Sequence, residues 1–457
     1  MLRIFGNVKD LDEKYIRMVE TPVERLILRM AIPTISIMLI SALYNMADTY
    51  FVGWIGTRAT AAVGVSFPLM MLIQAMGFFF GHGSGNYISR QMGAQNWDVA
   101  AAMAATGFIS ALICGATLMI SGLVFLDTFA RFFGATEEIL PYTCDYVFYI
   151  FIGAPWMLGS LALNNMLRFQ GSANYGMIGM ISGAVLNIAL DPLFIFVFNM
   201  GVSGAALATI ISQFVSCCLL LVGCSCKGNI RINPRKFSPQ FKFYKEIVRG
   251  GLPSLFRQGF ASIATICLNH AAGSYGVAVI AAISIVQRVT IIANYALLGL
   301  GQGFQPVCGF NYGAERYDRV IKGFWFCVKV SFVIMLFLSV AGFFLASQIV
   351  ALFRRDDAEV ILVGALALQL QCIPFPLMSW VIPNNMMLQT IGKAFEASLL
   401  AFARQGLFLL PALFILTPYL GVFGIQLCQP IADFATFLLS IPLGLRVLKE
   451  MKENKSA

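Results

Sequence analysis

Charged side chains are scarce in this sequence. Lys, Arg, Asp and Glu make up 12% of its 457 residues, whereas soluble domains carry about 25%. Histidines number only two, His82 and His270, so we expect neither a metal cluster nor a histidine-based catalytic pair. The eleven cysteines are an odd number and lie mostly in apolar runs, which argues against a disulfide framework. These scarcities disfavour a soluble domain, and neither an enzyme activity nor a cofactor is expected.

Apolar residues dominate instead. Hydrophobic residues account for 59% of the chain, and its mean hydropathy is +0.80. Several apolar runs exceed the roughly 20 residues that a membrane-spanning helix requires, so tilted or bent helices are expected. We predict an all-α integral membrane protein with twelve transmembrane helices over the runs 26–56, 61–81, 99–126, 139–165, 173–198, 203–226, 246–273, 277–304, 322–348, 359–386, 395–417 and 421–446.

The basic residues predict the orientation of these helices. One set of alternate loops, together with both ends of the chain, contains 24 Lys and Arg, and the opposite set contains four. Because basic residues are retained on the cytoplasmic side, both termini are expected there. Segment 227–249 has the charge of a nucleic-acid patch, but cytoplasmic loops are basic anyway, and no nucleic-acid partner is expected. Neither a signal peptide nor a transit peptide is recognisable at the start.

The chain also repeats itself. Shifted by 220 residues, Pro33 aligns with Pro253, and Asn164-Asn165 aligns with Asn384-Asn385. The first six apolar runs therefore correspond to the last six. Because each half contains an even number of helices, both halves insert in the membrane with the same orientation, as in transporters built from parallel repeats. We predict a cytoplasmic N-terminal segment at 1–24, an N-lobe at 25–226, a cytoplasmic linker at 227–245, a C-lobe at 246–448 and a cytoplasmic tail at 449–457.

A carboxylate lies inside the fifth apolar run. Asp191 follows Asn187 by four residues and is therefore on the same helix face. An ionisable group within a spanning helix costs at least ~2.5 kcal/mol and by default marks a functional site. The amide can donate a hydrogen bond to the acid, or the two side chains can share a small cation.

Other polar residues lie at a similar depth. Asp48, Asp191 and Thr209 are each about seven or eight residues from the expected outer end of their run, or roughly 10–12 Å below the outer surface. Asn45 lies three residues before Asp48 on the same face. Two carboxylates in a low-dielectric pocket can share a proton, and oxygen ligands suit a hard cation. We predict a proton or sodium site; the alternative is that each polar group only bonds across a helix interface.

This chemistry is not duplicated. Shifted by 220 residues, Asp48 aligns with Leu268 and Asp191 aligns with Pro411. The cation site is therefore expected in the first lobe alone. Two equal lobes enclosing a central cavity suit alternating access, in which the site opens to one side of the membrane and then to the other.

Together these features resemble a known family, the multidrug and toxic compound extrusion (MATE) transporters, and in particular their DinF- or MepA-like branch. The resemblance covers the chain from about Thr21 to Leu448. It rests on the twelve runs in two halves and on the motifs at 44–49, 187–192, 204–209 and 301–306.

The resemblance implies cation-coupled efflux. In such transporters H⁺ or Na⁺ moves inward while a small organic compound, often cationic and amphipathic, moves out. The resemblance also implies a plasma-membrane location, and we expect a monomer in the lipid bilayer. Acids that some branches carry on the seventh and tenth helices are missing from the interiors of those runs here. The coupling site, for H⁺ or for bound Na⁺, is assigned to Asp48, Asn187, Asp191 and Thr209.

Further residues are assigned more loosely. A tyrosine of the fourth helix joins the coupling network in this family; Tyr146 is the best match, with Tyr142 and Tyr149 close by. Bending of the first helix is associated with Pro33. Asp433, with Gln429 one turn before it, either faces the cavity or pairs with Arg257 or Arg288. Candidate cavity residues are Tyr44, Gln74, Gln287 and Asn294, and His82 is expected to pack in a Gly-His-Gly turn.

Two other functional classes were weighed. A flippase for lipid-linked precursors would share the two-lobed plan, but it would need basic residues in its cavity, and only Arg257 and Arg288 are arginines well inside the runs. The flippase remains the alternative hypothesis. An integral membrane enzyme would need acids, histidines or a metal at the membrane surface, and the charged turn at 354–357 is better explained as a solvated loop.

Overall fold

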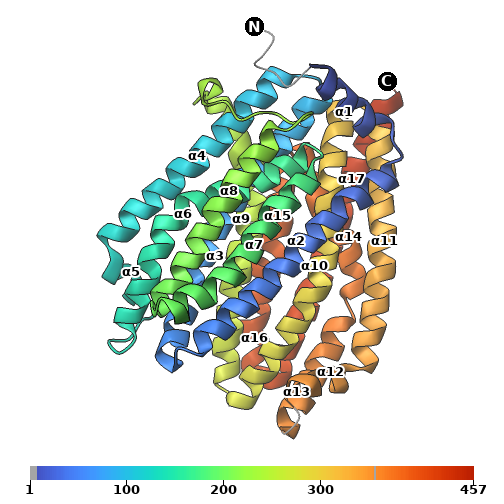
Figure 1. The fold of residues 1–457 in the computed structure, drawn as a ribbon. Helices are drawn as coiled ribbons and strands as arrows, with labels where there is room; N and C mark the ends of the chain where they lie inside the picture. Colours follow the sequence, from blue (N-terminus) through green and yellow to red (C-terminus); the bar gives the residue numbers. More distant parts are fainter. Residues whose placement is uncertain (1–7, 355–356, 457) are drawn as a thin grey trace. The chain divides into compact units, whose positions relative to one another are not determined.

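The computed structural model describes residues 8–354 and 357–456. Within these ranges every regular element is a helix, which confirms the all-α prediction (Figure 1). Apolar segments of this length form helices in a bilayer because each backbone N–H and C=O then bonds within its own segment.

Short connections join the helices. Two of the helices continue into π-helical turns, η1 after α7 and η3 after α15. In chain order the elements are α1 (Val8–Glu20), α2 (Val23–Gly53), α3 (Thr57–Gly93), α4 (Trp97–Val124), α5 (Leu126–Phe132), α6 (Leu140–Phe169), α7 (Ala173–Pro192), η1 (Leu193–Val197), α8 (Val202–Ser225), η2 (Pro234–Lys236), α9 (Phe241–Gly273), α10 (Val277–Gly313), α11 (Tyr317–Phe344), α12 (Ala346–Phe353), α13 (Ala358–Cys372), α14 (Phe375–Ile391), α15 (Ala394–Phe402), η3 (Ala403–Leu409), α16 (Leu410–Leu420) and α17 (Val422–Ser456).

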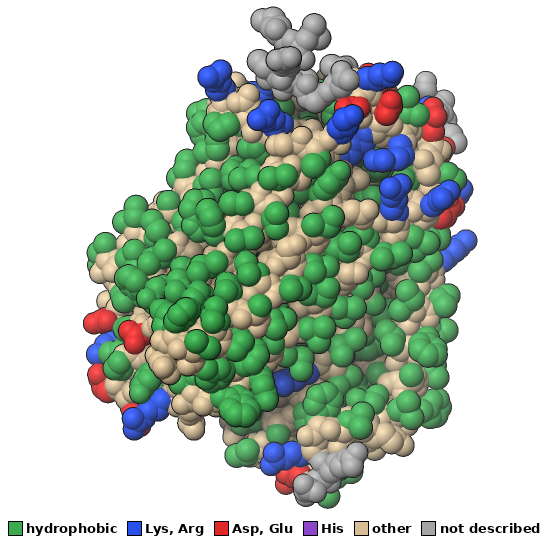
Figure 2. Space-filling view, in the orientation of Figure 1, with side chains coloured by type: hydrophobic (Ala, Val, Ile, Leu, Met, Phe, Trp, Pro, Cys, Tyr) green, Lys and Arg blue, Asp and Glu red, His purple; other side chains and the backbone are tan. Residues whose placement is uncertain are grey.

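The helices account for all twelve predicted runs. Among the described residues, ten spans are long and apolar enough to cross a membrane, and α13 with α14 forms an eleventh that bends by 55°. That bend lies at Pro374, which cannot donate the helical hydrogen bond. The run 246–273 is occupied by α9, which begins with several basic residues. On the face shown in Figure 2, hydrophobic side chains cover the middle of the helices and most Lys and Arg lie near helix ends.

The chain forms two compact units. The first contains the described residues up to Thr21 together with Ile32–Leu255, and the second contains Pro22–Ala31 together with the described residues from Phe256 onward. The predicted lobes are divided differently, because segment 22–31 belongs to the second unit and segment 227–255 to the first.

Both transitions between the units occur inside a helix. The chain changes unit just before Pro33 in α2 and just after Pro253 in α9, at the two prolines that the internal repeat aligns. Proline removes one backbone hydrogen bond from a helix and favours bending there. The two prolines that the repeat aligns are places where a helix can bend. At both of them the chain passes from one unit to the other.

The N-terminal segment forms α1, which packs on the first unit through buried residues such as Leu11. The Lys14 ammonium is 4% exposed and donates to Ser172 Oγ at 2.7 Å, to the Gly228 carbonyl at 2.8 Å and to Asn229 Oδ1 at 2.6 Å. These three acceptors match the three hydrogens of an ammonium group. Helix α1 is thereby fastened to the α6–α7 turn and to the segment that follows α8.

The expected turn at His82 is wrong, because α3 is continuous through this position. His82 is fully buried, with Nε2 2.9 Å from the Arg168 guanidinium and Nδ1 3.0 Å from Ser254 Oγ. Since arginine can only donate, His82 accepts at Nε2 and its remaining hydrogen is on Nδ1. The Gly-His-Gly segment thus places a neutral, hydrogen-bonded imidazole between α3, α6 and α9.

Glycines bring α3 and α9 into close backbone contact. A Cβ atom on Gly83 would lie 2.3 Å from the Ile247 carbonyl oxygen, and one on Gly251 would lie 2.4 Å from the Phe79 carbonyl oxygen. Both obstructing atoms belong to the backbone, so no side-chain rotation can relieve the overlap. Glycine is required here for the distance between the helices rather than for a turn.

We therefore expect Gly83→Ala to destabilise the protein by about 1–3 kcal/mol, as overpacked positions do. Gly64→Ala in the same helix is the matched control, because a Cβ there has no atom within 4 Å. It should leave stability unchanged or raise it by up to about 1 kcal/mol through helix propensity. Thermal unfolding of the purified protein in detergent measures both variants. Equal melting temperatures for the two would contradict the close α3–α9 contact.

Candidate functional site

Three of the predicted residues meet at the end of α7. Asn187 and Asp191 lie in its last turns, and Thr209 faces them from α8. Asn187 Nδ2 is 3.4 Å from Asp191 Oδ1 and 3.4 Å from Thr209 Oγ1, while Thr209 Oγ1 is 3.1 Å from the Ala205 carbonyl oxygen. All three side chains are at most 3% exposed. An acid, an amide and a hydroxyl are therefore buried together.

Asp48 completes this group from α2. Asp48 and Asp191 are close enough for their charges to interact electrostatically. Both are also close enough to interact electrostatically with the hydroxyl groups of Tyr44 and Tyr146. Tyr146 is fully buried, with its hydroxyl 3.6 Å from Met70 Sδ. Helices α2, α6, α7 and α8 thus bring two carboxylates and two phenols together within the first unit.

Several oxygens of the site have no hydrogen-bond partner. They are Asp48 Oδ1, Asp191 Oδ2 and Asn187 Oδ1, and each is buried. Leaving a buried acceptor unsatisfied is costly, more so when it carries charge. Such oxygens are suited to receive a proton or a cation. No group of three or more His, Cys, Asp and Glu in the described parts of the chain is placed to hold a metal, so a bound Na⁺ would depend on amide and hydroxyl oxygens as well.

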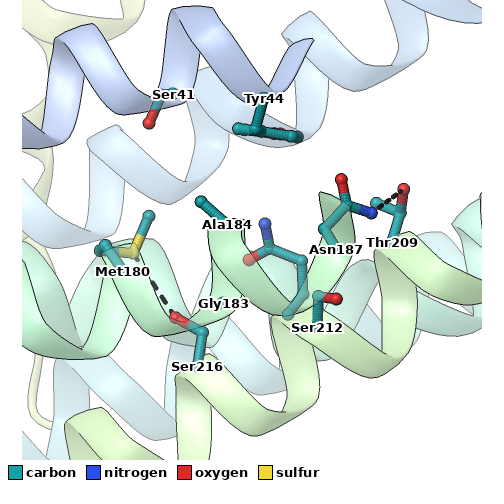
Figure 3. A pocket seen from close by; sticks show the side chains of 10 residues that line it. Ser41, Tyr44, Met180, Gly183, Ala184, Asn187, Thr209, Ser212 and Ser216 are labelled. Carbon is teal, nitrogen blue, oxygen red and sulfur yellow. Dashed lines mark hydrogen bonds between the residues drawn. The ribbon is translucent and has the colours of Figure 1, made fainter. Parts of the chain in front are cut away.

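A small cavity adjoins the site, as Figure 3 shows. Its volume of about 20 Å³ is enough for one or two water molecules, whereas drug-sized sites measure roughly 300–1,000 Å³. In this conformation the cavity therefore admits a small polar species but no drug. It is lined by Ser41, Tyr44, Met180, Gly183, Ala184, Asn187, Thr209, Ser212, Gln213 and Ser216.

Other predicted residues lie apart from this group. Asn45 is exposed, and its amide donates to the Ser41 carbonyl of its own helix at 2.8 Å. The Asn294 amide likewise donates to the Thr290 carbonyl at 3.0 Å in the second unit. Gln74 and Gln287 are half-buried, on α3 and α10, and do not line the cavity. Only Tyr44 among the candidate substrate residues lines it.

Asp433 has a different partner from those predicted. It pairs with neither Arg257 nor Arg288 but with Arg404, whose Nε lies 2.7 Å from Asp433 Oδ1, while Gln429 Nε2 donates to the same oxygen at 2.7 Å. Arg404 belongs to the π-helical turn η3. Arg404 falls within the predicted run 395–417, but only Arg257 and Arg288 were considered as arginines well inside the runs, so this partner was missed. Asp433 is fully buried, yet both of its oxygens have partners.

Comparisons with known proteins agree with this architecture. The MatE family model matches residues 33–193 and, a second time, residues 253–415. The two matches begin 220 residues apart, which confirms the internal repeat. The multidrug export protein MepA of Staphylococcus aureus is 27% identical over 440 residues, which cover 94% of this chain and 96% of that protein.

Solved structures are similar along almost the whole chain. One is described as the outward-facing conformation of a multidrug resistance MATE family transporter of the MOP superfamily; it is 28% identical, with a TM-score of 0.89, and the match covers 96% of this chain and 98% of that one. Another, described as MATE in the bent conformation, is also 28% identical, has a TM-score of 0.90 and is matched over 97% and 99% of the two chains.

The stability of variants can test whether Asp433 is an acid that stabilises the fold through its ion pair with Arg404. Arg404→Met should destabilise the protein by about 3–5 kcal/mol, because it leaves a buried carboxylate uncompensated. Adding Asp433→Asn should restore most of this loss, since the remaining amide is neutral and can still bond Gln429. Arg288→Met, at an exposed position of α10, is the control and should change stability by less than about 0.5 kcal/mol. Thermal unfolding in detergent is the measurement, and additive losses in the double variant would rule out the pairing.

Proposed function

The chain belongs to the MATE family of transporters, and we propose that it exports small organic compounds in exchange for H⁺ or Na⁺, with the cation site in its first unit. As a family member it is a multi-pass membrane transporter and no enzyme. The observation that carries the proposal is a pair of acids, the half-buried Asp48 and the fully buried Asp191, each with a buried oxygen that no hydrogen bond satisfies. The name of the S. aureus relative, a multidrug export protein, supports the substrate class.

The site suits a reversible cation. A buried carboxylate that lacks a counter-ion gains much from neutralisation, because a charge in a low-dielectric surrounding is costly. Two interacting acids bind the first cation in common. Asn187, which contacts Asp191, and Thr209, which contacts Asn187, are neutral polar groups that then influence which cation fits.

Coupling requires that the site bind its cation differently in the two facing states of the transporter. An ion can shift a conformational equilibrium only by its difference in affinity between the states. We propose that neutralisation of Asp48 and Asp191 in the outward-facing state lets α2 rearrange about Pro33, which reduces the space for the organic compound and favours its release.

The charge distribution supports a proposed orientation, and the family supports a proposed location. The excess of Lys and Arg in one set of loops favours cytoplasmic termini, and membership of the MATE family favours a plasma-membrane location. The chain contains 40 Phe and 21 Met, side chains that can form adaptable apolar cavities. Such a cavity would suit the apolar part of an amphipathic organic cation. We propose a monomer as the working unit.

A lipid flippase is less well supported. Holding a pyrophosphate would require free cationic groups within the membrane. Arg404 instead forms an ion pair with Asp433, and Arg257 donates to Asn385 Oδ1 at 3.3 Å. Both arginines therefore already have partners in the second unit, and Arg288 is at an exposed position of α10.

Efflux from proteoliposomes tests the proposal. A fluorescent organic cation should leave vesicles containing the wild-type protein under an imposed pH gradient or Na⁺ gradient. Asp48→Asn and Asp191→Asn should each slow gradient-driven efflux at least ~10-fold, or about 1.4 kcal/mol in coupling, because an amide cannot take up the cation's charge. Asp145→Asn, an exposed acid of α6, is the matched control and should transport normally. Normal pumping by both site variants would disprove the assignment.

A further inference from the structure

The internal repeat extends to exposed residues at the starts of α2 and α9. Shifted by 220 residues, Arg25 aligns with Lys245, and Arg29 aligns with Arg249. All four side chains are exposed. In each helix the two basic residues are four positions apart and therefore lie on the same face. Arg25 and Arg29 form the α2 pair, and Lys245 and Arg249 form the α9 pair.

An exposed apolar side chain accompanies each pair. Leu28 in α2 is 43% exposed, and Val248, at the aligned position of α9, is 47% exposed. Each lies three residues after the first basic residue of its pair and therefore on the same side of the helix. In α2 the apolar surface continues to Ile32, which is 62% exposed and lies one turn further along the helix. The α2 face thus passes from positive charge to apolar surface in the direction of the span.

The opposite face of each helix start is firmly packed. A Cβ atom on Gly303 of α10 would lie 2.6 Å from the Ala31 backbone nitrogen, and one on the aligned Gly83 of α3 would overlap the Ile247 carbonyl oxygen. The first contact is within the second unit, and the second is within the first unit. Close backbone packing therefore determines which face of each helix remains exposed.

The basic residues of the α2 pair are not neutralised within the fold. Among the residues that the structure describes, none forms an ion pair or hydrogen bond with Arg25, Arg29 or Lys245. The adjacent acid Glu24 is instead 2.9 Å from the Lys322 ammonium. Like charges four residues apart in a helix repel one another and destabilise it. An anionic group beside both members of a pair would replace this repulsion with attraction.

The α9 pair has one acid nearby and also a third basic residue. Arg249 Nη1 is 3.2 Å from Glu246 Oε1, but the other oxygen of Glu246 is 2.7 Å from Arg90. Lys242 is exposed and lies three residues before Lys245, on the same face. Because Glu246 is shared between two arginines, the face of the α9 pair keeps a positive charge.

This combination of groups suits an anionic phospholipid. Arg and Lys donate charge-assisted hydrogen bonds to phosphate oxygens, and an exposed apolar side chain beside them suits an acyl chain. Both pairs lie at the start of an apolar run, where basic residues meet the headgroups of anionic lipids. The orientation of the helices requires basic residues on one side of the membrane. It requires neither their spacing of four residues nor an apolar neighbour in both copies.

We propose that the α2 pair and the α9 pair are two repeat-related lipid sites. Each binds the headgroup phosphate of one anionic phospholipid, and the acyl chain of that lipid lies against Leu28 or Val248. One site is on each unit, because segment 22–31 belongs to the second unit and segment 241–255 belongs to the first. The inference goes beyond the proposed transport and does not depend on it.

Native mass spectrometry of the purified protein tests the proposal. Phosphatidylglycerol, or phosphatidylcholine with the same acyl chains, is added to the detergent. The wild type should retain two phosphatidylglycerol molecules and should bind this lipid at least about tenfold more tightly than phosphatidylcholine, since each basic residue near an anionic headgroup contributes about fivefold. Arg25→Gln with Arg29→Gln should lose one bound molecule, and Lys245→Gln with Arg249→Gln should lose the other.

Two control variants separate charge at the sites from other effects. Lys449→Gln with Lys452→Gln removes two exposed basic residues of α17 and should still retain two lipid molecules. Arg25→Lys with Arg29→Lys keeps the charge and should also retain both, whereas a variant damaged in its fold would not. Thermal unfolding in detergent checks that each variant is folded.

Three results would overturn the inference. The first is equal retention of phosphatidylglycerol and phosphatidylcholine by the wild type. The second is an unchanged number of bound phosphatidylglycerol molecules in both glutamine variants of the two pairs, which would leave these residues with a role in helix orientation alone. The third is displacement of the lipid by an equal concentration of glycerol phosphate, which would show that the pairs bind a soluble phosphate and not a lipid.

Discussion

A carboxylate buried among apolar helices must be neutralised, and the way this is done separates the acids of this protein. Asp433 and Asp191 are both fully buried. Asp433 has an arginine and a glutamine on its oxygens, so its charge is compensated within the protein. Asp191 has a long contact to one amide and an oxygen without any partner. The charge of Asp433 is thus compensated by fixed side chains of the fold. The charge of Asp191 has no such partner, which fits the proposal that a reversibly bound proton or cation neutralises it.

Much of this arrangement was predictable from the sequence because it depends on helix geometry. Spacing by four residues places Asn187 and Asp191 on one face, and equal depth in neighbouring spans places Thr209 beside them. Hydropathy likewise predicted every long helix. These inferences need only the regular rise and turn of an α-helix, and Asn187, Asp191 and Thr209 all lie within α-helices, α7 and α8.

The failures occurred where the helix is irregular or where pairing is distant. Arg404 meets Asp433 across 29 residues of chain, and its direction is set by the π-helical turn η3. A π turn shifts the register of the residues around it, so spacing alone could not identify the pair. Asn45 failed differently: it shares a face with Asp48 by spacing, yet its amide bonds back to its own helix at Ser41. Neither the register shift nor such a local hydrogen bond is visible in the pattern of residues.

The internal repeat shows how one scaffold can carry different chemistry in its two copies. Asn187 aligns with Leu407, which lies within η3, so the π-helical turn of the second unit occupies the place that the amide has in the first. In the first unit the π-helical turn η1 comes later, directly after Pro192, and α7 is regular through Asn187 and Asp191. That regular stretch lets the amide and the acid of the first unit lie on one face with Thr209 beside the amide. The two units thus keep the same fold while differing both in the position of the π-helical turn and in the residues at the aligned positions, Leu407 and Pro411 in place of Asn187 and Asp191.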